Sequence, residues 1–369
     1  MKPNKIETWQ MTVPGKLERV SLDVPEVKPG EVLVEIAGCG ICHTDLGYFY
    51  DGVPTVTKPP LTLGHEISGK VVEGDSHWMG KEVIVPAVMP CNHCAICAGG
   101  RGNRCLAQKM PGNSMGIYGG FSSHIVVPSA DLCAVENRGG FALSHLAVIA
   151  DAVTSPYQAA MRGEIKAGDL TIIIGATGGV GIYATQITRA LGAKEVIGIA
   201  RNPVKLEKSL HYGATKVISS QGKDVKAVRD EFRAYCKEKG LPSNTGWKIF
   251  EWTGTGEGQA IALELLSYVG MLVIAGYGMQ KNEYMMSRLM AFDADIRGTW
   301  GCLPKYYPVV LKMVLEKKIE IEPFVETRPM SQIQEAFEEV HKGKTEKRIV
   351  LTPEFLVEEE KQNNIEMEE

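Results

Sequence analysis

The sequence predicts an α/β protein in which one domain is a doubly wound parallel sheet and another is mainly β. Two observations support this prediction. In residues 154–297, apolar strands alternate with helical stretches, and a glycine-rich turn joins the first strand to the first helix. Residues 1–153 instead contain short apolar runs separated by Gly and Pro. The first pattern is typical of a nucleotide-binding sheet, and the second is typical of a β-barrel-like domain.

Size and composition agree with a two-domain globular protein. A chain of 369 residues is too long for a single hydrophobic core. The net charge of −4 and the lack of a long basic run argue against nucleic acid as a partner. There is no stretch of 18 apolar residues and no apolar signal core near the start, so we expect no membrane insertion and a cytoplasmic location. The acidic segment 358–369 is expected to be a solvated tail.

The β-rich region contains a compact cysteine motif, C-x2-C-x2-C-x7-C, formed by Cys91, Cys94, Cys97 and Cys105. A reducing cytoplasm disfavours disulfides, and the last spacing differs from that of bacterial iron–sulfur motifs. Zinc needs four soft ligands in a tetrahedron, which a glycine-containing loop can supply. We therefore predict a closed, structural zinc site in a lobe at residues 91–105, with an iron–sulfur cluster or a disulfide pair as alternatives. His93 is surplus to this set and is expected to be an exposed loop residue.

Three other segments of this region carry residues with metal-ligand chemistry. They are Cys42 in GCGICHTDL, His65 in LGHEISG and Asp151 in VIADAVTSPYQAA. Each has an ordinary interpretation by itself, namely a small buried hydrophobic residue, a core histidine and a helix cap. Together they form a thiolate, imidazole and carboxylate set that can hold zinc and leave a fourth position open for substrate. The sequence thus predicts a second, catalytic metal site.

The glycine-rich turn of the second region is IIIGATGGVGIYA, at residues 172–184. Backbone N–H groups at the start of a helix can bind a pyrophosphate, and glycine lets the phosphate approach closely. We predict that this turn binds a dinucleotide, and a merely tight strand-to-helix turn is the alternative. The residues concerned are Gly175, Gly178, Gly179, Val180 and Gly181.

The second strand of this region ends at Ala200 and is followed by Arg201. An acidic residue at this strand end would bind the adenosine ribose of NAD, and none is present. Arg201 could instead meet the 2′-phosphate of NADP, so the local chemistry favours NADP. The alternatives for Arg201 are stacking on the adenine or pointing into solvent. Further on, residues 306–318 and 331–343 are expected to be helical, and residues 348–352 are expected to form a final strand.

The chain resembles the zinc-dependent medium-chain alcohol dehydrogenases over nearly its whole length. The shared features are a C-G-x-C-H-T-D segment, a G-H-E, the four-cysteine lobe, a G-x-x-G-G-V-G turn and a closing R-I-V-L. This resemblance implies a GroES-like catalytic domain at residues 1–153, a Rossmann coenzyme-binding domain at 154–297, and a return to the catalytic domain within 298–369. It also implies two Zn²⁺ per chain and a homodimer or homotetramer.

The resemblance also implies individual roles. Zinc would polarise the substrate alcohol, Thr44 would accept its proton, and a hydride would pass to the nicotinamide. Cys42 and His65 match zinc ligands, and Asp151 stands where members of the family have a cysteine or an acidic residue. The remaining matches are a second-shell or transient ligand at Glu66, coenzyme pyrophosphate contacts at His43 and Arg348, and a packing role for Cys39.

Two positions depart from the family pattern. Gly47 stands where many members have a histidine that passes the proton to solvent, and the acidic residue after Ala200 is missing. The whole sequence is nevertheless similar to members that oxidise a ring alcohol β to a CoA thioester with NAD⁺. This similarity favours NAD, with NADP not excluded, and a small-molecule acyl-CoA substrate. The alternatives are a dehydrogenase of another secondary, aryl or polyol alcohol, a reductase of activated C=C bonds, and a zinc-finger binding module.

Overall fold

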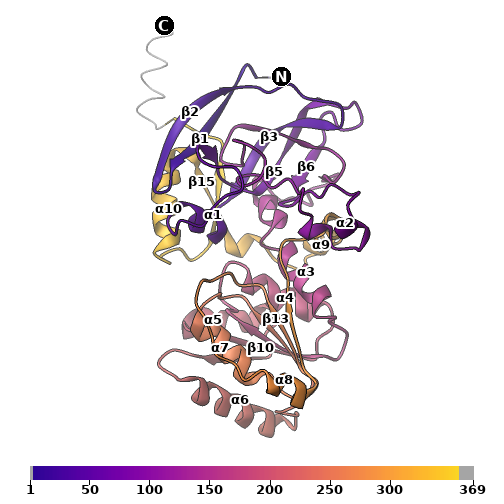
Figure 1. Cartoon of the computed structure of the whole chain (residues 1–369), viewed down its shortest axis with the longest axis vertical. Helices are drawn as coiled ribbons and strands as arrows, with labels where there is room; N and C mark the ends of the chain where they lie inside the picture. Colours follow the sequence, from indigo (N-terminus) through magenta and orange to yellow (C-terminus); the bar gives the residue numbers. More distant parts are fainter. Residues whose placement is uncertain (1–2, 357–369) are drawn as a thin grey trace. The chain divides into compact units, whose positions relative to one another are not determined.

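The computed structural model describes residues 3–356, and the acidic segment 358–369 lies outside them. The chain divides into two units, whose elements Figure 1 colours along the sequence. Unit 1 contains the described residues 3–152, 301–315 and 321–356, and unit 2 contains residues 153–300 and 316–320. No helix within the described part of the chain is long and apolar enough to cross a membrane.

Unit 1 consists mainly of two β-sheets. The larger sheet has the strand order β15-β16-β3-β5-β6-β8, and β7 also pairs with β3. All its pairs are antiparallel except β15–β16, which is parallel. The smaller sheet has the order β2-β1-β4. The strands are β1 (Lys5–Val13), β2 (Lys16–Asp23), β3 (Glu31–Gly40), β4 (Leu61–Thr62), β5 (Glu66–Gly74), β6 (Glu82–Val85), β7 (His124–Pro128), β8 (Cys133–Ala134), β15 (Val325–Pro329) and β16 (Arg348–Thr352).

The core of unit 1 follows from the periodicity of its elements. Val32, Val34 and Ile36 alternate along β3, so they lie on one face of the strand and are buried together. Ile333 and Phe337 are one helical turn apart and join the same core from α10. The α-helices of unit 1 are α1 (His43–Phe49), α2 (Ala95–Ala98), α9 (Tyr307–Leu315) and α10 (Ile333–His341).

Unit 2 contains one parallel sheet with the strand order β11-β10-β9-β12-β13-β14. The order changes direction between β9 and β12, which is the crevice where doubly wound sheets bind nucleotides. The strands are apolar, as expected when helices cover both faces of a parallel sheet. They are β9 (Leu170–Ile174), β10 (Glu195–Ala200), β11 (Lys216–Ser219), β12 (Trp247–Glu251), β13 (Met271–Ile274) and β14 (Asp295–Gly298).

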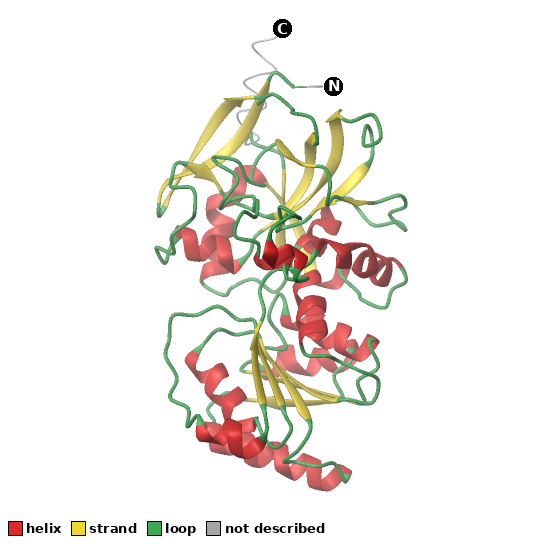
Figure 2. Cartoon of the chain, turned by 45° about the vertical axis from the view of Figure 1, so that its right-hand side comes forward, coloured by secondary structure: helices red, strands yellow, loops and turns green. Residues whose placement is uncertain are grey.

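Helices lie on both faces of this sheet, as Figure 2 shows. α6 illustrates why the sequence forms them: Asp224 caps its first turn, Gly240 ends it in the left-handed region, and Val228, Phe232 and Tyr235 form its buried stripe. The predicted combination of a doubly wound parallel sheet and a mainly β part is confirmed. The helices are α3 (Thr154–Arg162), α4 (Gly181–Ala190), α5 (Pro203–Lys208), α6 (Val225–Lys239), α7 (Gly256–Leu265) and α8 (Ser287–Phe292).

Candidate metal and coenzyme sites

The cysteine lobe brings its four thiols to one point. Cys94 precedes α2, Cys97 lies within it, and Cys105 follows a turn of 3-10 helix at Gly102–Arg104. The Sγ–Sγ distances are 3.9 Å for Cys91–Cys97, 3.5 Å for Cys94–Cys97 and 3.8 Å for Cys94–Cys105. A tetrahedron with Zn–S bonds of about 2.3 Å has edges of about 3.8 Å, so a single zinc ion fits.

The same geometry disfavours the two alternatives for this lobe. The four lobe cysteines are free thiols, and their separations are well above the roughly 2 Å of a disulfide bond. A cluster of several irons would hold its cysteines farther apart. His93 is exposed, and its Nδ1 lies 2.6 Å from the backbone oxygen of Cys91 rather than among the thiols.

The thiols of the lobe differ in how easily they ionise. The backbone N–H of His93 lowers the pKa of the Cys91 thiol to about 6. Desolvation and the neighbouring thiols of Cys94 and Cys105 raise the pKa of Cys97 to about 12. Thiolates this close repel one another, and a divalent cation at their centre is what would allow all four to ionise.

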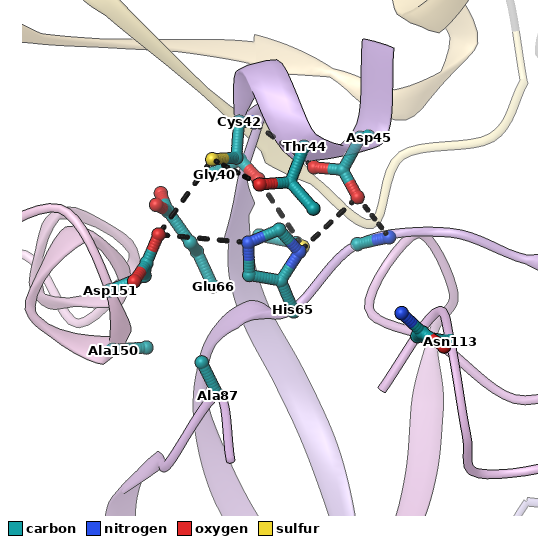
Figure 3. A network of polar contacts seen from close by, with 12 residues as sticks. Gly40, Cys42, Thr44, Asp45, His65, Glu66, Ala87, Asn113, Ala150 and Asp151 are labelled. Atoms are coloured by element: carbon teal, nitrogen blue, oxygen red, sulfur yellow. Dashed lines mark hydrogen bonds and ion pairs between the residues drawn. The ribbon is translucent and has the colours of Figure 1, made fainter. Parts of the chain in front are cut away.

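The second group of candidate ligands lies at the junction of three segments of unit 1. Cys42 is the N-cap of α1, His65 directly precedes β5, Glu66 begins β5, and Asp151 follows a 3-10 helix at Ser144–Ala150. One ligand atom from each of these four residues lies within 4.8 Å of the others. Figure 3 shows Cys42, His65 and Asp151 pointing toward one another. The structure therefore brings together the Cys, His and carboxylate set that the sequence analysis assembled.

The distances within this second group suit a metal as well. Asp151 Oδ2 is 3.7 Å from Cys42 Sγ and 3.7 Å from His65 Nε2. Ligands of those types around zinc are about 3.3–3.5 Å apart in a tetrahedron, so a shift of a few tenths of an ångström suffices. Thr44 Oγ1 is 3.6 Å from Cys42 Sγ, which puts a hydroxyl beside the ligands.

Asp45 orients two of the three candidate ligands and was missed by the sequence analysis. Its buried carboxylate accepts hydrogen bonds from the backbone N–H groups of Cys42 and Gly64, both at 3.0 Å. Its Oδ1 also lies 3.3 Å from His65 Nδ1. This contact leaves the other ring nitrogen, Nε2, directed toward Asp151. Metal-binding histidines usually have this arrangement, in which one ring nitrogen faces a carboxylate and the other faces the metal. The local signal was its position in the first turn of α1, where an acidic side chain closes a capping box.

Glu66 is buried and forms a bidentate ion pair with Arg348 from β16. Arg348 Nε donates to Glu66 Oε2 at 2.7 Å, and Nη2 donates to Oε1. Gly40 permits this pair, because a Cβ at that position would overlap the Glu66 carboxylate. Arg348 was expected to contact the coenzyme pyrophosphate, and Glu66 was expected to be a second-shell or transient metal ligand. In the structure these two residues pair with each other. His43 is exposed at the start of α1, next to Cys42.

The acidic side chains of this second group also favour the binding of a metal cation. The thiol of Cys42 and the carboxylates of Asp45, Glu66 and Asp151 gather around one guanidinium and one imidazole. Burial alone would lower the pKa of His65, but the charge of Asp45 and the hydrogen bond with Asp151 hold it well above its usual value. The cluster thus favours additional positive charge, which Zn²⁺ would provide.

We predict that Asp151→Asn weakens zinc binding at this second group or lowers kcat/KM by at least about 10-fold. The substitution removes a charged oxygen ligand but keeps the shape of the side chain, so the metal would retain excess positive charge. Zinc content and turnover measure the effect. The control is Asp75→Asn, which changes an exposed carboxylate of the same unit. Full zinc content and activity in Asp151→Asn would mean that water or Glu66 holds the third position.

The glycine-rich turn of unit 2 lies at the switch point of the parallel sheet. Gly175 follows β9 with φ +86°, a conformation that favours glycine. Gly181 begins α4, and a Cβ there would overlap the backbone oxygen of Gly175. Gly178 and Gly179 are exposed, and Val180 is the N-cap of α4. The turn thus presents bare backbone at the start of a ten-residue helix, as a pyrophosphate site requires.

Glu251 shapes the adjacent turn after β12 and was also missed. Its fully buried carboxylate accepts hydrogen bonds from the backbone N–H groups of Thr253 at 2.7 Å and Gly254 at 3.2 Å. Thr253 in turn lies against Gly175, with its Cγ2 3.0 Å from where a Cβ on that glycine would be. The sequence feature that could have indicated this role is an acidic residue at the end of an apolar strand, shortly before the T-G-T-G segment at residues 253–256.

The second strand of the parallel sheet ends where the sequence predicts, at a position that no acidic residue follows directly. β10 ends at Ala200, and the side chain of Arg201 is exposed. Asn202 is the N-cap of α5, where its Oδ1 accepts a hydrogen bond from the Lys205 N–H at 3.0 Å. Arg201 is therefore accessible at the strand end where a coenzyme ribose binds in doubly wound folds.

Comparisons with known proteins agree with this architecture. Residues 28–137 match the model of the alcohol dehydrogenase GroES-like domain, and residues 179–316 match that of the zinc-binding dehydrogenases. A sorbitol dehydrogenase of Bombyx mori is 26% identical over 89% of this chain and 93% of its own length. An alcohol dehydrogenase of Geobacillus stearothermophilus is 29% identical over 91% of this chain and 95% of its own length.

Solved structures show the same fold. Galactitol-1-phosphate dehydrogenase from Escherichia coli superimposes with a TM-score of 0.83 at 23% identity, covering 94% of this chain and 100% of that chain. An alcohol dehydrogenase from Thermotoga maritima also gives a TM-score of 0.83 at 23% identity, covering 95% and 100%. At this level of identity the likeness concerns the fold alone.

Proposed function

Because the chain belongs to the zinc-dependent medium-chain alcohol dehydrogenase family, we propose that it oxidises a secondary ring alcohol of an acyl-CoA with NAD⁺. The observation that carries the dehydrogenase chemistry is the convergence of Cys42, His65 and Asp151 beside the hydroxyl of Thr44. Zinc at this point supplies a Lewis acid that lowers the pKa of an alcohol group.

The side chains around the metal ligands have separate tasks in this proposal. Thr44 Oγ1 accepts the hydrogen bond of the substrate hydroxyl, and as it takes that proton it passes its own hydroxyl proton on. Asp45 holds His65 in the orientation that keeps Nε2 for the metal. Position 47 has no side chain that could relay the proton, since it is Gly47, so the proton leaves by water or by a hydroxyl group of the substrate.

The proposed substrate is 6-hydroxycyclohex-1-ene-1-carbonyl-CoA, a cyclic β-hydroxyacyl-CoA with a ring double bond. The support is the overall similarity of the sequence to dehydrogenases that act on this thioester in anaerobic benzoyl-CoA degradation. Its allylic secondary alcohol suits the chemistry, because conjugation stabilises the carbonyl group that forms. Oxidation transfers a hydride from the carbinol carbon to NAD⁺ and releases the hydroxyl proton.

The test is a comparison of substrates with NAD⁺ as acceptor: the CoA thioester, its free acid, cyclohexanol, benzyl alcohol and sorbitol. Binding energy from the CoA part should appear in kcat/KM, so the thioester should exceed the free acid by orders of magnitude. Equal rates for thioester and free acid would reject the acyl-CoA assignment. A preference for sorbitol would favour a polyol dehydrogenase, which is the activity named for the Bombyx mori relative.

Coenzyme selection gives a second test. We predict that Ala200→Asp raises the preference for NAD⁺ over NADP⁺, as a ratio of kcat/KM values, by at least about 10-fold. The new carboxylate would accept the ribose hydroxyls and repel a 2′-phosphate. Arg201→Ala serves as the companion variant, because it removes the charge that directly follows Ala200 without adding a ribose ligand. A wild-type preference for NADP⁺ would instead assign the 2′-phosphate contact to Arg201.

The proposal also includes the cellular and oligomeric state. Closely spaced free thiols in the lobe suit a reducing compartment such as the cytoplasm. A homodimer or homotetramer follows from the family, and light scattering of the purified protein measures it. Two zinc ions per chain would support the dehydrogenase, whereas a single zinc in the cysteine lobe would favour a binding module.

A further inference from the structure

The buried hydroxyl of Tyr307 connects two segments of unit 1 next to the second group of ligands. Tyr307 is the first residue of α9 and is fully buried. Its hydroxyl donates a hydrogen bond to the backbone oxygen of Ala150 at 2.6 Å and accepts one from the backbone N–H of Ala87 at 3.0 Å. Ala87 follows β6, and Ala150 ends the 3-10 helix that leads directly into Asp151.

These two hydrogen bonds anchor the backbone at Ala150, which directly precedes the third candidate ligand, Asp151. Figure 3 shows Ala87 and Ala150 beside the cluster, with the Asp151 carboxylate directed at Cys42 and His65. Asp45 already ties down the backbone at Cys42 and the ring of His65. Asp151 comes from a separate segment, more than a hundred residues from Cys42 along the chain, so its position depends on how that segment is anchored.

We propose that Tyr307 is a positioning residue for the catalytic metal site. Its hydroxyl holds the Ala150 carbonyl against the Ala87 amide and thereby fixes the backbone from which Asp151 reaches the metal. This inference rests on the proposed function, because it takes Asp151 as a zinc ligand. The tyrosine belongs to residues 301–315, which return to unit 1 after residues 153–300, so the metal site depends on this stretch as well as on residues 3–152.

The experiment is zinc binding to Tyr307→Phe, measured by competition with a chromogenic chelator and by metal content. Loss of the hydroxyl keeps the buried ring but removes its hydrogen bond to the Ala150 carbonyl next to Asp151. We expect the affinity of the catalytic site to fall by about 10-fold or more, the range found when groups that orient metal ligands are removed. The cysteine lobe should keep its zinc. Cobalt in place of zinc should show an altered visible spectrum, because its absorption reports coordination geometry.

Two controls separate positioning from simple loss of stability. Tyr235→Phe removes a hydroxyl that donates to Glu195 at 2.9 Å in unit 2, and it should leave both zinc affinities unchanged. Val310→Ala loosens the buried face of α9 but keeps the Tyr307 hydroxyl, so it should lower stability more than metal affinity. If Tyr307→Phe does not fold, 4-aminophenylalanine at this position retains a donor toward Ala150 and should retain the metal.

The outcomes distinguish the inference from the function on which it rests. Two zinc ions in the wild type, with an unchanged affinity and cobalt spectrum in Tyr307→Phe, would overturn the role of Tyr307 alone. An equal fall in affinity in Val310→Ala would also overturn it, since the hydroxyl would then not be the cause. A wild-type protein that binds zinc only in the cysteine lobe would overturn the proposed function itself. A double substitution with Asp151→Asn should show less than additive losses if Tyr307 acts through Asp151.

Discussion

Replacing Cys42 by serine should abolish turnover while leaving a folded protein that still binds coenzyme. In the proposed site the thiolate would supply charge and a soft ligand to the catalytic metal, and a neutral serine hydroxyl would supply neither. Lewis-acid stabilisation contributes several kcal/mol to the transition state, so its loss should lower kcat by about 10³-fold or more. Metal content should fall from two zinc ions per chain to one.

The fold should survive because the residue keeps a backbone hydrogen bond that anchors the start of α1. The Cys42 N–H donates to Asp45 at 3.0 Å, and that bond does not involve sulfur. The matched control is Cys133→Ser, which changes a buried thiol of β8 in the same unit, outside the candidate metal group. Cys133→Ser should keep two zinc ions and its activity. Near-normal turnover in Cys42→Ser would reject the assignment of this cysteine as a ligand.

The cysteine lobe and the glycine turn could be predicted because each is local in sequence. The lobe places four cysteines within fifteen residues, and short turns are enough to bring Cys105 back to Cys91. The turn at Gly175 needs only a strand, a tight bend and a helix. In such cases the short chain between the functional residues determines their geometry, so their spacing in the sequence is enough to predict the site.

The candidate catalytic group and the residues that orient it depend on long-range packing, which spacing does not encode. Cys42 and Asp151 are 109 residues apart, and Glu66 and Arg348 are 282 residues apart. Beside the complementary ligand chemistry of Cys42, His65 and Asp151, the family resemblance connects these segments. It did not indicate Tyr307, whose role comes from two backbone contacts that any buried tyrosine could make in another fold. Nor did it reveal that the Arg348 guanidinium is engaged by Glu66.

Cys97→Ser should have the opposite effect to Cys42→Ser, because it should destabilise the lobe and spare the chemistry. The lobe has almost no core of its own, since α2 buries none of its residues. Its base is closed by the backbone pair of Met89 and Lys109, with hydrogen bonds of 2.9 and 2.8 Å. Above this base, a metal holding four thiolates is the main stabilising interaction, and metal binding in small sites is folding free energy.

Loss of one thiolate should therefore unfold the lobe locally, at a cost of at least about 3 kcal/mol in the stability of that segment. Limited trypsin digestion measures this directly, because Arg101 and Arg104 are exposed within the lobe and become cleavable once its backbone opens. His93→Ala is the control, as it changes an exposed lobe residue outside the thiol cluster and should resist trypsin like the wild type. Uncleaved Cys97→Ser molecules should retain part of their turnover, since Cys42, His65 and Asp151 lie in other segments. A Cys97→Ser protein with two zinc ions and wild-type resistance to trypsin would show that the lobe does not need its metal to fold.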